Sequence, residues 1–97
     1  MEFGKKAKPV SPEEMAAVHH ALESPIRRNM IILMNQGVLS VPEIAPAGGK
    51  MLDYHLHRLE LAGLIELEGE KIVLTEAGVA YGGLVKKEKE LGGADKI

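Results

Sequence analysis

The chain has 97 residues, 12 Lys and Arg against 14 Asp and Glu, a formal net charge of -2 and no cysteine. This length supports one domain with a modest core, which excludes a two-domain enzyme with a cleft between its domains. The lack of cysteine excludes disulfides, thiolate zinc sites and cysteine nucleophiles. No apolar run approaches the roughly 20 residues of a membrane span. We therefore expect a cytoplasmic protein without a membrane segment.

Two short segments flank the expected domain, which covers residues 11–91. Residues 1–10 carry three lysines against one glutamate and little apolar content, which indicates a flexible basic arm. Residues 92–97 begin with two glycines, and we expect them to be a frayed tail.

Two helix-start signals lie in residues 11–37. Residues 11–14, Ser-Pro-Glu-Glu, combine a capping Ser, Pro at the first helical position and Glu three residues after the cap. Residues 24–25, Ser-Pro, repeat the cap and the proline, and Gly37 is expected to stop the second helix. Because residues 30–34 are all apolar, the second helix has no polar face there. We expect it to be the buried centre of the domain.

Polar residues on these two helices have mostly structural interpretations. His19 falls on the apolar stripe of the first helix, so we expect it to be hydrogen-bonded at the edge of the core, whereas His20 is expected to be exposed. Arg27 and Arg28 start the second helix and are expected to pair with Glu23 or with solvent, as surface arginines near acids commonly do.

The next segment predicts a strand stub and two further helices. The stub is expected at residues 38–39, and Ser40 then caps a short helix that Pro46 should interrupt. Residues 47–49, Ala-Gly-Gly, indicate a turn before a helix over residues 50–62. The periodicity of this last helix places three leucines on its inward face: Leu52, Leu56 and Leu59.

The period changes from helical to two over residues 65–74, which predicts a short β-hairpin. Thr75 then caps a final helix whose apolar stripe holds Tyr81, Leu84 and Val85. The order is helix, helix, stub strand, helix, helix, hairpin, helix. This predicts a mainly α fold with a small β-hairpin, arranged as a winged helix-turn-helix.

Four segments in this order resemble the ArsR-like winged-helix regulators of archaea and bacteria. They are ALESPIRR at 21–28, LSVPEIA at 39–45, LDYHLHRLELAGLI at 52–65 and LTEAG at 74–78. The resemblance covers about residues 21–85. It implies a DNA-binding transcription regulator, usually a homodimer, whose helix at about 50–62 enters the major groove while the hairpin acts as a wing.

The candidate interface residues follow from this interpretation. We expect contacts to double-stranded DNA from Lys50, Met51, Tyr54, His57, Arg58 and Lys71. Gly78 and Gly82 open a groove on the last helix, which we expect to pack against the first helix, within the chain or across a dimer axis. The expected homodimer interface comprises Met15, Val18, Leu22, Tyr81, Leu84 and Val85.

Two alternatives to a DNA-reading helix remain open. The helix surface can be plainly solvated, or Tyr54 and Leu61 can form an outward apolar spot that suits a protein partner. The hairpin carries three glutamates, Glu66, Glu68 and Glu70, against Lys71 alone, so DNA phosphates would repel it. An acidic hairpin therefore also fits a winged-helix module that binds another protein.

Catalytic and metal-binding signals are weak. The sequence shows no glycine-rich phosphate loop after a strand and no nucleophile elbow. His55 and His57 lie two residues apart, so on a helix they point about 200° away from each other and cannot hold one metal ion. His55 borders the leucine face and is interpreted as structural. We predict no enzyme activity, cofactor or metal site.

Overall fold

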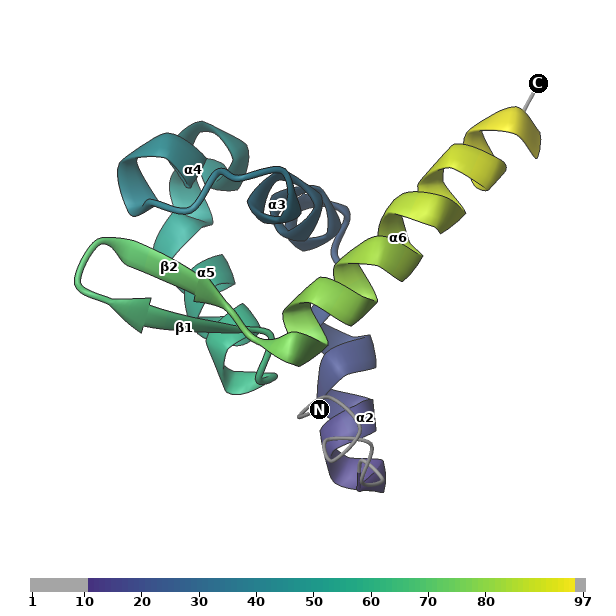
Figure 1. The fold of residues 1–97 in the computed structure, drawn as a ribbon, viewed down its shortest axis with the longest axis horizontal. Helices are drawn as coiled ribbons and strands as arrows, with labels where there is room; N and C mark the ends of the chain where they lie inside the picture. Colours follow the sequence, from purple (N-terminus) through teal and green to yellow (C-terminus); the bar gives the residue numbers. More distant parts are fainter. Residues whose placement is uncertain (1–10, 96–97) are drawn as a thin grey trace, which may run out of the picture.

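The computed structural model describes residues 11–95, with side chains described for residues 11–91. Within this range, helices surround one core and a two-stranded hairpin lies at its side (Figure 1). The expected order of elements and the mainly helical class with a small hairpin are confirmed. The expected arm at 1–10 lies outside the described residues. The elements are α2 (Pro12–Ala21), α3 (Pro25–Asn35), α4 (Val41–Gly48), η1 (Gly49–Met51), α5 (Leu52–Leu61), β1 (Ile65–Glu68), β2 (Lys71–Leu74) and α6 (Glu76–Asp95).

Serine side chains cap the first three of these helices, as the sequence predicts. The hydroxyl groups of Ser11, Ser24 and Ser40 each accept a hydrogen bond from the backbone amide three residues later, at 3.1, 3.2 and 3.3 Å. At α2 the Glu14 carboxylate also accepts from the Ser11 amide at 3.1 Å, which completes a capping box. Each such cap contributes about 1 kcal/mol to helix stability.

Pro46 does not interrupt α4, contrary to the prediction. The helix continues to Gly48, because proline's fixed φ suits a helix and its missing N–H removes one bond near the short helix's end. The Gly49 amide donates to the Ala45 carbonyl and closes the last turn around the proline. The expected turn at 47–49 is therefore reduced to Gly49, whose φ of +63° favours glycine.

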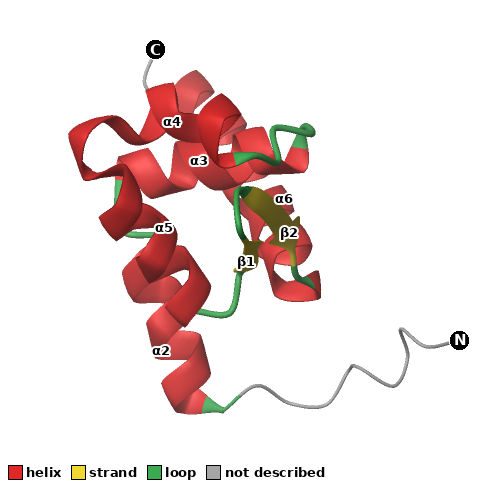
Figure 2. Ribbon diagram, turned by 90° about the vertical axis from the view of Figure 1, so that its left-hand side faces the viewer, coloured by secondary structure: helices red, strands yellow, loops and turns green. Residues whose placement is uncertain are grey.

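The centre of the core is α3, as its unbroken apolar run predicts. Met30 and Ile31 are fully buried, and α4, α5 and α6 pack against this helix (Figure 2). Burial of each such side chain contributes about 1.5–3 kcal/mol relative to leaving it in water. The fully buried large side chains from the other elements and their junctions are Ile44, Leu59, Leu64, Ile65 and Ile72.

The hairpin pairs antiparallel strands and is tied to the start of α4. Its register sets Ile65 opposite Leu74 and Leu67 opposite Ile72, with the turn at Gly69. The expected strand stub is present as a short backbone pairing one residue later. The Leu39 carbonyl accepts from the Ile72 amide at 2.9 Å, and the Val41 amide donates to the Glu70 carbonyl at 2.8 Å.

The last helix packs on α3 rather than on α2. A Cβ at Gly82 would overlap the Asn35 side chain, and the Asn35 Nδ2 donates to the Gly78 carbonyl at 3.2 Å. The glycine face predicted to meet the first helix therefore meets the central one. Figure 1 shows the C-terminal turns of α6 projecting beyond the other elements.

Residues 92–95 are part of α6, and the rest of the expected tail, residues 96–97, lies outside the described residues. The two glycines there follow four turns of established helix, and extension of a helix is much easier than its nucleation. Among the helices of residues 11–95, none is long and apolar enough to cross a membrane.

Candidate nucleic-acid interface

One side of α5 and of the preceding 3-10 helix η1 faces solvent. Met51 is 54% exposed, Tyr54 49% and Leu61 64%, and Lys50 and His57 are also exposed. We call these five residues the outer face. The opposite side of α5 is held in the core by Leu56 and Leu59, as predicted. The structure thus brings four of the six expected DNA-contacting residues together: Lys50, Met51, Tyr54 and His57.

The other two expected residues lie elsewhere. Arg58 is half-buried, and its Nη2 lies 3.2 Å from Nδ1 of His20 on α2. Because a guanidinium only donates, His20 is the acceptor in this contact. Lys71 is exposed on β2. Its backbone lies opposite that of Glu68 in the hairpin and forms an isolated β-bridge with Ser40. Neither residue belongs to the outer face.

Several elements hold α5 in place. It packs against α2, α3, α4 and β1. In Figure 2, α2 lies below α5 on the same side of the molecule. At its C-terminal end, the Glu60 Oε2 accepts a hydrogen bond from the Leu67 amide of β1 at 3.3 Å. The outer face is therefore presented by a supported helix rather than by a loop.

Arg27 is buried behind the outer face, contrary to the expectation that it pairs with Glu23 or solvent. It is 7% exposed, and its Nε donates to the Ala21 carbonyl at 2.6 Å. Its Nη1 lies 3.0 Å from Nδ1 of His55, and its Cζ lies 5.8 Å from the Tyr54 ring centroid. One guanidinium thus contacts the end of α2 and two consecutive side chains of α5.

The neighbouring polar residues also differ in part from expectation. Arg28 donates to the backbone carbonyls of Leu22 and Glu23, at 2.8 and 3.0 Å, rather than to a carboxylate. His19 is exposed, because the buried residues of this segment are Val18, Ala21 and Leu22. His20 is exposed as predicted.

His55 is a structural residue, as predicted, with 7% of its surface exposed. Burial lowers the pKa of its imidazole, and the adjacent Arg27 guanidinium lowers this pKa further. The ring is therefore neutral at pH 7. Since Arg27 has no acceptor atom, Nδ1 of His55 is the unprotonated nitrogen and Nε2 carries the proton.

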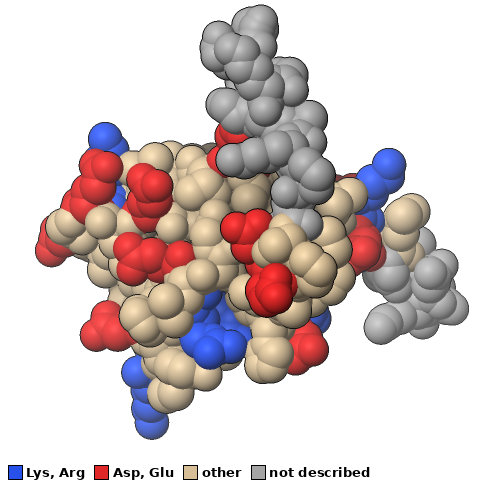
Figure 3. All heavy atoms as spheres, turned by 90° about the horizontal axis from the view of Figure 1, so that it is seen from below, with Lys and Arg blue, Asp and Glu red and all other residues tan. Residues whose placement is uncertain are grey.

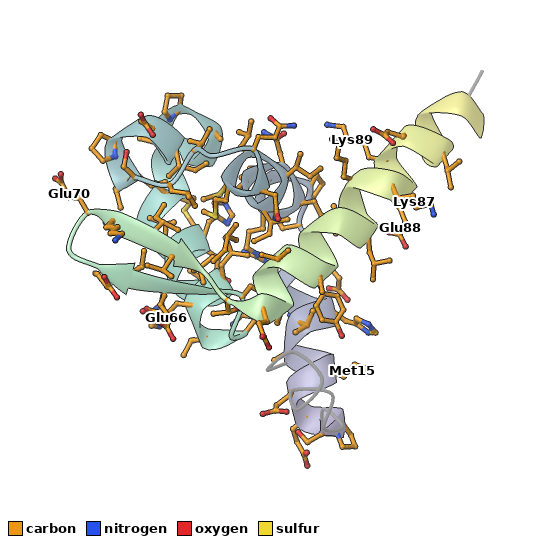
Figure 4. The ribbon with its side chains drawn as sticks, viewed as in Figure 1. Met15, Glu66, Glu70, Lys87, Glu88 and Lys89 are labelled. Atoms are coloured by element: carbon orange, nitrogen blue, oxygen red, sulfur yellow. The ribbon has the colours of Figure 1, made fainter. Side chains whose placement is uncertain are left out.

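The hairpin presents an acidic surface. Glu66, Glu68 and Glu70 are all exposed, with Lys71 beside them. Figure 3 shows acidic side chains gathered on the side of the molecule where β1 and β2 lie in Figure 1. In Figure 4, Glu70 points away from the body of the protein at the hairpin turn. The hairpin therefore offers little attraction to phosphate.

The six residues expected at a dimer interface separate into two groups. Val18, Leu22 and Val85 belong to the chain's own core, because each is at most 9% exposed. Met15, 40% exposed, and Leu84, 55% exposed, remain at the surface, with Tyr81 half-buried between α2 and α6. A groove of about 290 Å³ at this junction is lined by residues that include His19, Tyr81 and Leu84.

Sequence reasoning did not identify the buried role of Arg27, which is the main functional candidate it missed. The contact joins an arginine at a helix start to a histidine 28 residues later, and neither residue alone indicates burial in the sequence. In the described part of the chain, no group of three or more His, Asp or Glu residues is placed to hold a metal ion. No family model, curated protein or solved structure matches this chain.

Proposed function

We propose that this chain is a DNA-binding transcription regulator of the winged helix-turn-helix type, with η1 and α5 in the major groove. The observation that carries the proposal is the outer face, which presents Lys50, Tyr54 and His57 on a helix supported from behind by the core. A major groove about 12 Å wide admits one α-helix, and base edges there are read by side chains of this kind.

Four residues of the outer face, together with Arg58, have a role in this proposal. Lys50 contacts phosphate or the acceptor atoms of guanine, and Tyr54 and His57 donate hydrogen bonds to phosphates or base edges. Met51 offers apolar contact to a thymine methyl group. Arg58 contacts His20 and must leave this contact to reach phosphate.

In this proposal the hairpin is a wing that adds no affinity. Its three exposed glutamates repel phosphate, so binding depends on α5 and on the lysines of residues 1–10. Binding is consequently weak and sensitive to salt. We further propose a cytoplasmic homodimer, formed at the groove between α2 and α6 that Tyr81 and Leu84 line, with the exposed Met15 of α2 also in the interface. Its half-sites would lie about 34 Å apart, one turn of DNA.

Charge reversal at Lys50 tests the proposal. Fluorescence anisotropy with duplex DNA at about 50 mM salt is expected to show at least a tenfold weaker affinity for Lys50→Glu, because a phosphate contact becomes a repulsion. The matched control is Lys87→Glu, which makes the same change of charge on the projecting part of α6 (Figure 4) and should leave the affinity nearly unchanged. Absence of wild-type affinity for any duplex at this salt concentration would overturn the proposal.

Reversing one charge of the hairpin is expected to have the opposite effect. Glu70→Lys converts a repulsion at the hairpin turn into an attraction, so the affinity for duplex DNA should rise several-fold. The dependence of log affinity on log salt should also become steeper by about one, as expected for one added phosphate contact. Unchanged affinity and an unchanged slope would show that the hairpin lies away from the bound DNA.

A second candidate function is a winged-helix module that binds another protein. It is favoured by the exposed apolar groups of the outer face, Met51, Tyr54 and Leu61, and by the acidic hairpin. The duplex experiment separates the two candidates. A wild-type chain without affinity for duplex DNA, together with no gain in Glu70→Lys, would favour the protein partner.

A further inference from the structure

Three elements meet at the buried guanidinium of Arg27. It belongs to α3, donates through Nε to the last carbonyl of α2, and lies through Nη1 against Nδ1 of His55 on α5. Arg27 and His55 are both 7% exposed. This contact is a specific polar connection between the central helix and the helix that carries the outer face.

No carboxylate of the described residues is bonded to the pair. Among the described residues, neither Arg27 nor His55 has a hydrogen bond or ion pair with a carboxylate. The charged groups of α5 itself and of the elements around it are engaged elsewhere or exposed. On α5, Asp53 is exposed and Glu60 accepts from β1. Arg28 donates to backbone carbonyls and His20 of α2 contacts Arg58. Glu23 after α2, Glu43 of α4, Lys50 of η1 and the glutamates of β1 are exposed.

Protonation of His55 is incompatible with this geometry. A protonated Nδ1 is a donor, and it would face the Arg27 Nη1 donor at 3.0 Å. Two cations would then be buried together without a carboxylate bonded to either, an arrangement that is costly in a protein interior. The hydrogen bond must break, and either the imidazole or the guanidinium must move toward solvent.

We propose that the Arg27–His55 contact is a proton-sensitive latch that holds α5 against α3 when His55 is neutral and releases it when His55 is protonated. Because Tyr54 packs over the same guanidinium, release also disturbs the outer face. The effect of the latch on folding is independent of the proposed function, whereas its effect on DNA affinity rests on that function.

The direction of the pH dependence follows from linkage. The pKa of His55 is lowered in the folded chain and takes its ordinary value of 6.5 in the unfolded chain. Below pH 6.5 the unfolded state therefore binds more protons, so the contribution of the latch is complete above pH 6.5 and declines as the pH falls. One linked proton changes the unfolding equilibrium constant by at most about tenfold per pH unit.

Urea unfolding at pH 7.5 and at pH 5.5 tests the latch, with His55→Asn as the main variant. The Asn Oδ1 lies close to the position of Nδ1 and accepts from Arg27 at either pH. Between these pH values, the unfolding constant of the wild type should rise by up to about tenfold more than that of His55→Asn. The matched control is His57→Asn, an exposed histidine two residues further along the same helix, whose pH dependence of unfolding should match that of the wild type.

An NMR titration of the His55 ring in the wild-type chain covers the case in which His55→Asn does not fold. The expected result is a midpoint below pH 6.5, with the proton on Nε2 before titration. A midpoint at or above 6.5, or equal pH dependence of unfolding in the wild type and His55→Asn, overturns the latch. Affinity for duplex DNA at the two pH values is a separate measurement. A complete absence of affinity contradicts the proposed function, whereas the unfolding and NMR data alone decide whether the latch exists.

Discussion

Gly78→Ala is expected to lower the free energy of unfolding by about 2 kcal/mol, although alanine is the better helix former. A Cβ at this position would overlap the backbone carbonyl oxygen of Leu64, and it would also press on the Leu74 side chain. A backbone atom cannot rotate aside as a side-chain end can, so α6 itself must shift. That shift would also strain the hydrogen bond from Asn35 to the Gly78 carbonyl.

Gly83→Ala is the matched control for this prediction. It lies five residues further along the same helix, and a Cβ there meets no atom within 4 Å. Alanine should therefore raise the free energy of unfolding by about 0.8 kcal/mol, through helix propensity alone. Urea unfolding followed by circular dichroism measures both changes. Equal stabilisation by the two substitutions would contradict the packing of α6 on Leu64.

Leu59→Ala should have the largest effect among the variants considered, a loss of about 3 kcal/mol in the free energy of unfolding. Leu59 is fully buried and supports α5 from behind, so truncation leaves a cavity between this helix and its neighbours. The loss should be measured with the same urea method. In a chain of this size, a loss of this magnitude lowers Tm by roughly 12–24 °C.

Leu61→Ala is the companion variant, two residues further along α5. This side chain is 64% exposed, so the expected change in the free energy of unfolding is within about 0.5 kcal/mol. Comparison of the two variants distinguishes the stability supplied by the buried side of α5 from that supplied by the outer face. A large loss in Leu61→Ala with little change in Leu59→Ala would mean that α5 is rotated from the orientation described above.

Much of the fold follows from signals that act over a few residues. The serine caps, the glycine stops and the switch from helical to alternating period each depend on neighbours within one turn or one strand. The central place of α3 was also predictable, because a helix with five apolar residues in succession has no face suited to water. The exposed residues of α5 were found in the same way, as the side opposite the leucines.

Contacts between distant segments are the part that required the tertiary structure. Periodicity shows that Gly78 and Gly82 share a face, but it does not show that this face meets Leu64 and Asn35 rather than α2. The same holds for Val18 and Val85, whose apolar character suits a dimer surface as well as the chain's own core.

Arg27 shows most clearly why the sequence alone does not predict contacts between distant segments. An arginine at a helix start is ordinarily solvated, and its burial is favourable only where a distant carbonyl and imidazole accept its hydrogens. Those partners come from the end of α2 and from α5. Local sequence therefore decides which residues form a helix and which side of it is apolar, whereas the environment of a buried charge is decided by groups that only folding brings together.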